Sequence, residues 1–165
     1  MQNGSLADRL ARGPLALPEA ARILDRLAAA LDEAHRQGII HRDIKPANIL
    51  FDRLGEPYIS DFGIAKIAQS TPTLTGSAVI GTPGYISPEQ ARGEPGIDGR
   101  SDVYALGCML FQMLTGKQPY EGDLVALIYK HVNEPMPSLL TFNPDLPPDC
   151  DTVIMQATAK DRNER

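Results

Sequence analysis

Two polar motifs lie close together in the chain, with only short apolar runs between them. The first motif is His41-Arg42-Asp43-Ile44-Lys45-Pro46-Ala47-Asn48, and the second is Asp61-Phe62-Gly63. The intervening runs Ile49-Leu50-Phe51 and Pro57-Tyr58-Ile59-Ser60 have the apolar, β-branched and aromatic composition of short strands. Two short strands so close in sequence pair as a hairpin. The sequence therefore predicts that both motifs lie on one short β-hairpin.

Helical periodicity dominates the rest of the chain. Apolar residues recur at helical spacing from Glu19 to Ala34, and Gly38 is expected to end that helix in a left-handed conformation. We therefore predict a mainly α fold in which short β-hairpins carry the polar motifs. Further expectations are a short helix capped by Ser5 and reaching Arg12, a buried helix over Ser101–Leu114, an amphipathic helix over Asp123–Val132, a last helix over Cys150–Lys160, a strand-type run at Ile39-Ile40 and a loop over Gln69–Gly84.

Composition and charge exclude several classes of function. The chain has 165 residues, enough for one domain with a hydrophobic core, and its net charge of −5 argues against the basic footprint of a nucleic-acid-binding protein. Cys108 and Cys150 lack the spacing of metal ligands. We expect both to be reduced thiols, as in a protein from the reducing cytoplasm. The first residues show no signal-peptide pattern, and the longest apolar stretch, Val103–Leu114, is too short to span a bilayer. We therefore expect a cytoplasmic location and no membrane segment in this chain.

Two histidines outside the motifs are expected to take no part in the chemistry. His35 is predicted on the polar, solvated side of its helix. His131 is predicted near a helix C-terminus, where a positive charge is favourable.

The residue types in the two motifs suit phosphoryl transfer from ATP. This reaction needs positioning, charge neutralisation and an acceptor for the hydroxyl proton. Asp43 can orient an incoming hydroxyl, and Lys45, two residues on, can face the charge of the transferred phosphate. Asn48 and Asp61 offer the oxygen ligands that Mg²⁺ prefers, and Gly63 permits the backbone of a metal-binding turn. Each residue alone also has a structural explanation as a turn, cap or helix-start residue, but their joint order favours the catalytic interpretation.

The same motifs closely resemble those of eukaryotic-like protein kinases. His41–Asn48 is similar to the catalytic loop of that family, and Asp61-Phe62-Gly63 to its metal-binding turn. Ser87-Pro88-Glu89 resembles the Ala-Pro-Glu motif, and Ser101–Gly107 resembles the start of the long buried helix. The resemblance implies an enzyme that uses ATP and Mg²⁺.

Individual roles follow from that resemblance. It implies that Asp43 is the catalytic base, that Lys45 assists it, and that Asn48 and Asp61 hold Mg²⁺. The supporting residues that it implies are Leu50 beneath the adenine ring, His41 and Phe62 in a stacked core, Asp102 as acceptor of backbone N–H groups from the catalytic loop, and Glu89 paired with Arg165.

Two residues favour the serine/threonine branch, with a protein substrate that offers a Ser or Thr hydroxyl. Lys45 stands where these kinases carry lysine, and Thr82 matches the threonine that ties the substrate-docking loop to the base. The sequence from Gly81 to Gln90 resembles that of bacterial members of the kinase family. We also hypothesise autophosphorylation between Asp61 and Glu89, where a phosphate would pair with Arg42. The candidate acceptors are Thr71, Thr73, Thr75 and Ser77.

The nucleotide clamp of such kinases has no counterpart in the sequence. It contains no Gly-x-Gly-x-x-Gly, and no strand lysine precedes the catalytic loop. Residues 1–165 are therefore expected to be a kinase C-terminal lobe cut at both ends, inactive without the missing N-terminal lobe of the same protein. Membrane anchoring of that parent protein stays open. Two alternatives remain: a pseudokinase-like scaffold module, and a small-molecule phosphotransferase of related fold, which would lack Thr82 with Ser87-Pro88-Glu89.

Overall fold

The computed structural model describes residues 4–62 and 83–165, and within them the fold is mainly α with one two-stranded sheet. This confirms the predicted balance of helix and strand. The helices are α1 (Leu6–Leu10), α2 (Leu17–Arg36), α3 (Pro88–Ala91), α4 (Arg100–Thr115), α5 (Leu124–Asn133) and α6 (Pro148–Ala157). The strands are β1 (Ile49–Phe51) and β2 (Pro57–Ile59), and single turns of 3-10 helix occur at Pro46–Asn48, Pro83–Tyr85, Leu139–Thr141 and Arg162–Glu164.

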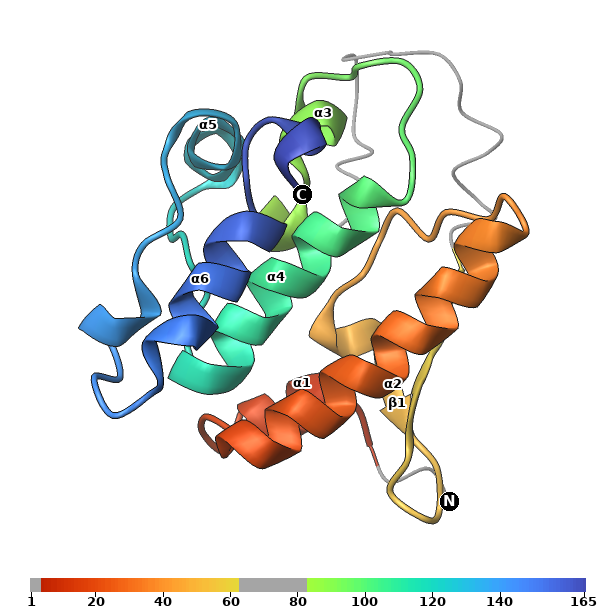
Figure 1. Ribbon diagram of the computed structural model, residues 1–165, viewed down its shortest axis with the longest axis vertical. Helices are drawn as coiled ribbons and strands as arrows, with labels where there is room; N and C mark the ends of the chain where they lie inside the picture. Colours follow the sequence, from red (N-terminus) through yellow and green to blue (C-terminus); the bar gives the residue numbers. More distant parts are fainter. Residues whose placement is uncertain (1–3, 63–82) are drawn as a thin grey trace.

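Helix α4 forms the centre of the fold, with α2 along one side and α6 along the other (Figure 1). Its buried side chains cover nearly its whole circumference and include Tyr104, Cys108, Phe111 and Met113, each with no exposed surface. The predicted buried helix is therefore confirmed, one residue longer at each end. Gly116 follows it with φ 74°, the left-handed conformation that glycine adopts without strain.

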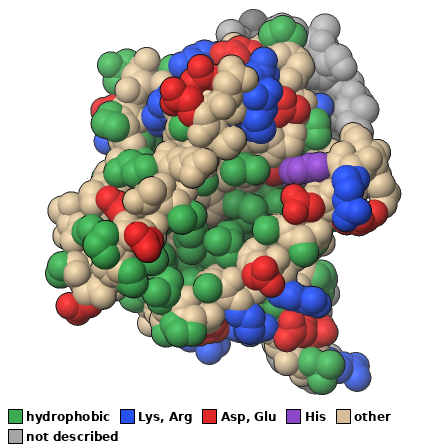
Figure 2. All heavy atoms as spheres, viewed as in Figure 1, with side chains coloured by type: hydrophobic (Ala, Val, Ile, Leu, Met, Phe, Trp, Pro, Cys, Tyr) green, Lys and Arg blue, Asp and Glu red, His purple; other side chains and the backbone are tan. Residues whose placement is uncertain are grey.

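Hydrophobic side chains gather over the central part of the face seen in Figure 2, whereas charged side chains lie mainly toward its edges. Within the two described ranges, no helix is both long and apolar enough to cross a membrane.

Helix α2 ends as the sequence predicts, but the strand expected after it does not form. Gly38 adopts φ 74°, and the backbone N–H of Ile39 donates to the carbonyl of Ala34 at 2.9 Å. This bond belongs to the helix cap, so the N–H of Ile39 is not available to a strand partner. Ile39 and Ile40 are irregular, and Ile39 is 45% exposed. The strand prediction at Ile39-Ile40 is wrong because capping uses the backbone there.

The β1–β2 hairpin is antiparallel and packs against α2 and α1. Its register pairs Ile49 with Ile59 and Phe51 with Pro57, so the residues before β1 face those after β2. On the α1 side, the guanidinium of Arg9 lies over the ring of Phe51, 3.4 Å from its centroid. The predicted hairpin is confirmed.

Helix α1 is shorter than expected, because it ends at Leu10 rather than Arg12. Its start is as predicted: the Ser5 hydroxyl accepts from the backbone of Asp8, whose carboxylate accepts from Ser5 in return. Helix α5 matches its prediction to within one residue, with Asp123 as the cap. Helix α6 covers Pro148–Ala157 rather than Cys150–Lys160, since Pro148 is favourable in a first helical turn.

His131 lies in the last turn of α5, but its side chain is buried in the interior. It has no exposed surface, and its Nδ1 is 2.9 Å from the hydroxyl of Tyr104. Burial lowers the pKa of His131 to about 4, and the positive charge of nearby Lys160 acts in the same direction. His131 does lie in the last turn of α5, as predicted, but the expected positive charge there is wrong, because tertiary packing removes the ring from water.

Candidate active site

The buried carboxylate of Asp102 organises the backbone of the loop after α2. Its Oδ2 accepts from the backbone N–H of His41 at 2.9 Å, and its Oδ1 accepts from that of Arg42 at 2.8 Å. The contact expected between Asp102 and this loop is therefore present. These charge-assisted bonds compensate for burying the carboxylate, which has no exposed surface.

His35 supplies a third donor to the same carboxylate. Its Nε2 lies 2.8 Å from Asp102 Oδ2, so the prediction of a solvated His35 is wrong. Gly99 makes this approach possible, because a Cβ there would lie 2.5 Å from Nδ1 of the His35 ring. The bond joins α2 to α4 directly behind the loop.

The ring of His41 connects the loop to the end of the hairpin. Its Nδ1 accepts from the backbone N–H of Asp43 at 3.2 Å, which places the ring proton on Nε2. Nε2 then donates to the carbonyl of Ser60 at 3.0 Å. The ring also lies against Phe62, with centroids 4.9 Å apart and planes inclined at 59°. His41 and Phe62, expected to stack, are thus in contact.

Asp43, Lys45 and Asn48 converge on one point of the loop. Lys45 Nζ lies 2.9 Å from Asp43 Oδ2, and both side chains keep some exposure, 20% and 25% respectively. Asn48 Nδ2 donates to the backbone carbonyl of Asp43 at 2.8 Å and to its Oδ2 at 3.2 Å. The carboxylate of Asp43 is therefore oriented by two donors while it remains accessible to a reactant.

Asn48 and Asp61 lie at neighbouring ends of the two strands. The register places Asn48 opposite Ser60, whose N–H and hydroxyl donate to the Asn48 carbonyl at 2.8 and 3.0 Å. The same hydroxyl is 3.2 Å from Asp61 Oδ2. Because the Asn48 side-chain nitrogen faces Asp43, its Oδ1 takes part in no hydrogen bond to the described residues.

The oxygen ligands of Asn48 and Asp61 suit Mg²⁺ better than a metal ion whose ligands all come from the protein. Among residues 4–62 and 83–165, no group of three or more His, Cys, Asp or Glu side chains is placed to hold a metal ion. Mg²⁺ usually keeps several waters and takes one or two carboxylates together with substrate phosphates. One exposed carboxylate, Asp61, beside one amide oxygen, Asn48, matches that requirement.

Arg42 and Asp61 are the two residues other than glycine with positive φ in the described part of the chain, at 66° and 55°. Such conformations cost about 1–3 kcal/mol each and persist where the surroundings impose them. At Arg42, Asp102 holds the N–H and Gln90 Nε2 donates to the carbonyl at 3.0 Å. One strained residue therefore directly precedes Asp43, and the other, Asp61, itself carries the second carboxylate of the site.

Gln90 is a site residue that the sequence analysis missed. Its Oε1 accepts from the N–H and hydroxyl of Ser87 at 3.2 and 3.1 Å while its Nε2 reaches Arg42. The Ser-x-x-Gln pattern of Ser87 and Gln90 is a capping-box signal that could have identified both Gln90 and the start of α3.

The expected pair of Glu89 and Arg165 is present and buried. The guanidinium contacts both carboxylate oxygens, at 2.6 and 2.9 Å, and the side chains are 3% and 0% exposed. Burial by itself raises the pKa of Glu89, but hydrogen bonds from Arg165 and Ser101 outweigh it and hold the pKa at about 2. This pair joins α3 to the last residues of the chain.

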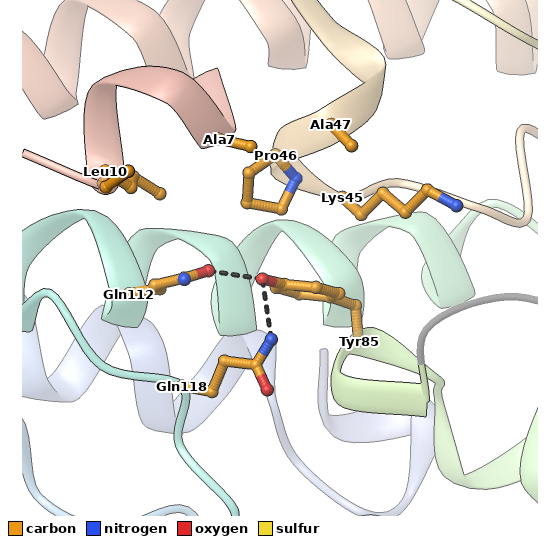
Figure 3. Close-up of a pocket in the computed structure, with 9 residues that line it drawn as sticks. Ala7, Leu10, Lys45, Pro46, Ala47, Tyr85, Gln112 and Gln118 are labelled. Carbon is orange, nitrogen blue, oxygen red and sulfur yellow. Dashed lines mark hydrogen bonds between the residues drawn. The ribbon is translucent and has the colours of Figure 1, made fainter. Parts of the chain in front are cut away.

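A pocket of about 360 Å³ opens beside Lys45 and was also missed from the sequence (Figure 3). Its residues come from α1 and its cap residue, the loop, the 3-10 turn at Tyr85, α4 and the segment after α4, and no local sequence pattern joins them. The hydroxyl of Tyr85 donates to Gln112 Oε1 and accepts from Gln118 Nε2 at 3.1 Å. Burial raises the pKa of Tyr85 to about 12, so its hydroxyl stays protonated.

Several predicted residues remain to be placed. Leu50 lies in β1, half-buried and paired with Tyr58. Those outside the described residues are Gly63, Thr71, Thr73, Thr75, Ser77 and Thr82.

Comparison with known proteins identifies the family. The family description "Protein kinase domain" matches residues 1–165. A probable serine/threonine-protein kinase PknB of Lactococcus lactis is 44% identical over 153 residues, and the serine/threonine-protein kinase PrkC of Bacillus subtilis is 43% identical over 152; each match covers 92% of this chain. PknB of Mycolicibacterium smegmatis is 46% identical over 93% of the chain. The chain spans about a quarter of the length of these relatives, 24%, 23% and 25%. The chain belongs to the protein kinase domain family.

Proposed function

We propose that this chain carries the catalytic loop and metal ligands of an ATP-dependent protein serine/threonine kinase of bacterial type. One observation carries the proposal: Lys45 and Asn48 together hold the Asp43 carboxylate at a loop whose hairpin also presents Asp61. The names of the relatives, all serine/threonine-protein kinases, support the same activity.

The proposed reaction transfers the γ-phosphoryl group of ATP to a Ser or Thr hydroxyl of a protein. Asp43 accepts the hydroxyl proton as the new O–P bond forms and the bond from the γ-phosphorus to the bridging oxygen breaks. Lys45 lies two residues away and balances charge on the transferred group. Asn48 Oδ1 and Asp61 would hold Mg²⁺, and the bound ion would neutralise negative charge on the phosphates. Leu50 offers apolar surface to the adenine ring.

The ATP site requires further protein groups. The sequence has no glycine-rich phosphate loop and no strand lysine ahead of His41. We infer that residues 1–165 act as a C-terminal lobe and that an N-terminal lobe of the same protein supplies the rest of the nucleotide clamp. Cys108 and Cys150 are both free, which is consistent with action in the cytoplasm.

The test is a chimera in which this chain replaces the 152 matched residues of PrkC. We expect the chimera to phosphorylate protein serine or threonine, and Asp43→Asn to lower the rate by a factor of about 10²–10⁴. Asp25→Asn, at an exposed position of α2, makes the same chemical change away from the site and is expected to leave the rate unchanged.

Different outcomes separate the alternatives. A folded chimera without transfer would favour a scaffold module, and phosphorylation of metabolites but not peptides would favour a small-molecule phosphotransferase.

The same preparation tests the regulatory hypothesis: mass spectrometry is expected to find phosphate on Thr71, Thr73, Thr75 or Ser77. Its absence from an active chimera would contradict autophosphorylation there.

A further inference from the structure

A second cavity, of about 430 Å³, lies between α3 and the last residues of the chain, and we call it the α3 cavity. Glu89 and Arg92 line it from α3 and its cap residue, Glu94 from the loop that follows, and residues 160–163 from the C-terminal side. Charged side chains of both signs gather at the top of the face in Figure 2, where Figure 1 places α3 and the end of the chain.

We propose that the α3 cavity binds the phosphate monoester of a phosphorylated serine or threonine in a protein segment. This binding goes beyond the proposed phosphoryl transfer and does not depend on it, because no group is transferred when the segment binds.

The carboxylates of the α3 cavity are already in use. Both oxygens of Glu89 contact Arg165, and Glu94 Oε1 lies 3.2 Å from Arg92 Nη1. Asp161 Oδ1 accepts two N–H groups of the following 3-10 turn, at 2.9 and 3.0 Å. Three lysine or arginine side chains in the lining and the adjacent Arg165 give four positive charges against three carboxylates. The charge around the cavity therefore favours an anion.

Two of the cations have only neutral partners. Lys160 Nζ donates to two tyrosine hydroxyls and to the carbonyl of His131, the last at 2.8 Å. Arg162 Nη1 donates to the carbonyl of Gly96 at 3.1 Å. Within the two described ranges, neither side chain forms a salt bridge with a carboxylate. Both charges can therefore act on a ligand in the cavity.

The two guanidinium groups supply the hydrogen bonds that a phosphate needs. Arg92 donates to Glu94 and, at 3.4 Å, to the carbonyl of Val132, and its side chain is 43% exposed. A guanidinium has more N–H donors than these bonds use, and Arg162 has further donors besides the one bonded to Gly96. The planar fork of arginine matches the oxygens of a phosphate in paired bonds.

The ammonium of Lys160 shows that the potential here is positive. Burial lowers the pKa of Lys160 to about 8, and the charges of Arg165 and Arg92 act in the same direction. A phosphate dianion in the cavity would counter these charges and raise the pKa of Lys160. A guanidinium or ammonium ligand would add to the repulsion, so the cavity disfavours cationic side chains.

The size of the cavity favours a phosphorylated polypeptide over free phosphate. Its volume of about 430 Å³ lies in the range of pockets that enclose drug-sized ligands, about 300–1,000 Å³, which exceeds what a phosphate ion requires. A bound segment would connect the C-terminal residues to α3, whose Gln90 donates to the carbonyl of Arg42. Occupancy would therefore stabilise the element that supports the catalytic loop.

The experiment is a titration of the full chain with a serine peptide, its phosphoserine form and inorganic phosphate, all at one ionic strength. The Cε resonance of Lys160 in the ¹³C-labelled chain, assigned by its loss in Lys160→Arg, reports binding at the α3 cavity. We expect the phosphopeptide to bind about tenfold more tightly than either other probe and to raise the pKa of Lys160.

Two variants are expected to change the affinity in opposite directions. Arg162→Gln removes a guanidinium and should weaken phosphopeptide binding about tenfold. Glu94→Gln removes the carboxylate that competes for Arg92 and should strengthen binding about threefold, which a folding defect cannot do. Arg53→Gln, exposed in the turn between β1 and β2 (Figure 1), is the matched control and is expected to leave the affinity unchanged.

The inference is overturned if the phosphopeptide binds no more tightly than the serine peptide, if the pKa of Lys160 does not rise, or if Glu94→Gln weakens binding. Equal affinity for inorganic phosphate would overturn the assignment to a polypeptide. Failure of the kinase proposal is seen separately, as an inactive PrkC chimera, because the titration involves neither ATP nor transfer.

Discussion

At the scale of single residues, the site depends on one buried carboxylate whose partners come from two directions. Asp102 accepts from the His35 ring and from two consecutive backbone N–H groups. One of those groups belongs to Arg42, which adopts φ 66°. The strained backbone next to the proposed base is therefore held by a group on a different element, α4.

Replacing Asp102 by asparagine tests this dependence. One oxygen becomes an NH₂ group, so one of the buried donors faces another donor and loses its partner. We expect the free energy of unfolding to fall by about 2–3 kcal/mol, measured by urea denaturation. Asp25→Asn at an exposed site is the control and is expected to have no measurable effect. A loss below about 0.5 kcal/mol would mean that the bonds from His41 and Arg42 to Asp102 do not hold the loop.

At the scale of elements, the contact between α4 and α6 depends on the missing side chain of Gly107. A Cβ there would lie 2.7 Å from Thr158 Cγ2 and 3.0 Å from the Cβ of Ala157. Gly107→Ala gains helix propensity of about 1 kcal/mol, but overpacking of a buried contact costs about 1–3 kcal/mol. We expect net destabilisation in thermal unfolding.

A second substitution distinguishes overpacking from other causes. Thr158→Ser removes the Cγ2 atom nearest to the added methyl group and keeps the hydroxyl that donates to Ile154. The double variant Gly107→Ala/Thr158→Ser is expected to be more stable than the sum of the single effects predicts. Additive effects would show that α6 does not constrain position 107.

The comparison of sequence and structure shows which interactions local patterns encode. The helical period of α2, the apolar run of α4 and the Ser5 cap depend on neighbouring residues, and the sequence predicted them to within a few residues. The strand at Ile39-Ile40 failed because a helix cap uses the same N–H. A local sequence pattern does not show whether a backbone N–H will bond within a helix cap or within a strand.

The site residues also divide into those whose partners are close in sequence and those whose partners are distant. Motif spacing brought together Asp43, Lys45 and Asn48, which lie within one short loop. It could not identify His35 or the pocket glutamines, because their partners are distant in sequence: 67 residues separate His35 from Asp102. Contacts of this range follow from the packing of α2, α4 and the turn at Tyr85.

At the scale of the whole molecule, two buried ionisable groups make stability depend on pH. The pKa of His131 falls from 6.5 to about 4 on folding, and that of Glu89 from 4.5 to about 2. In both cases the unfolded chain binds more protons, so stability falls as the solution is acidified. The His131 contribution is complete above pH 6.5 and is lost on approaching pH 4. The Glu89 contribution is lost between pH 4.5 and 2.

The variant His131→Gln separates the two contributions. Glutamine keeps an acceptor for the Tyr104 hydroxyl but does not titrate, so the fall in stability from pH 6.5 to 4 should flatten while the fall at lower pH remains. Each contribution corresponds to about 3 kcal/mol at most, measured as the free energy of unfolding in urea at a series of pH values. If the slope of unfolding free energy against pH above pH 4 is unchanged in His131→Gln, the acid sensitivity belongs to other groups. His131 is buried, and folding opposes its protonation, so removing it should flatten that slope.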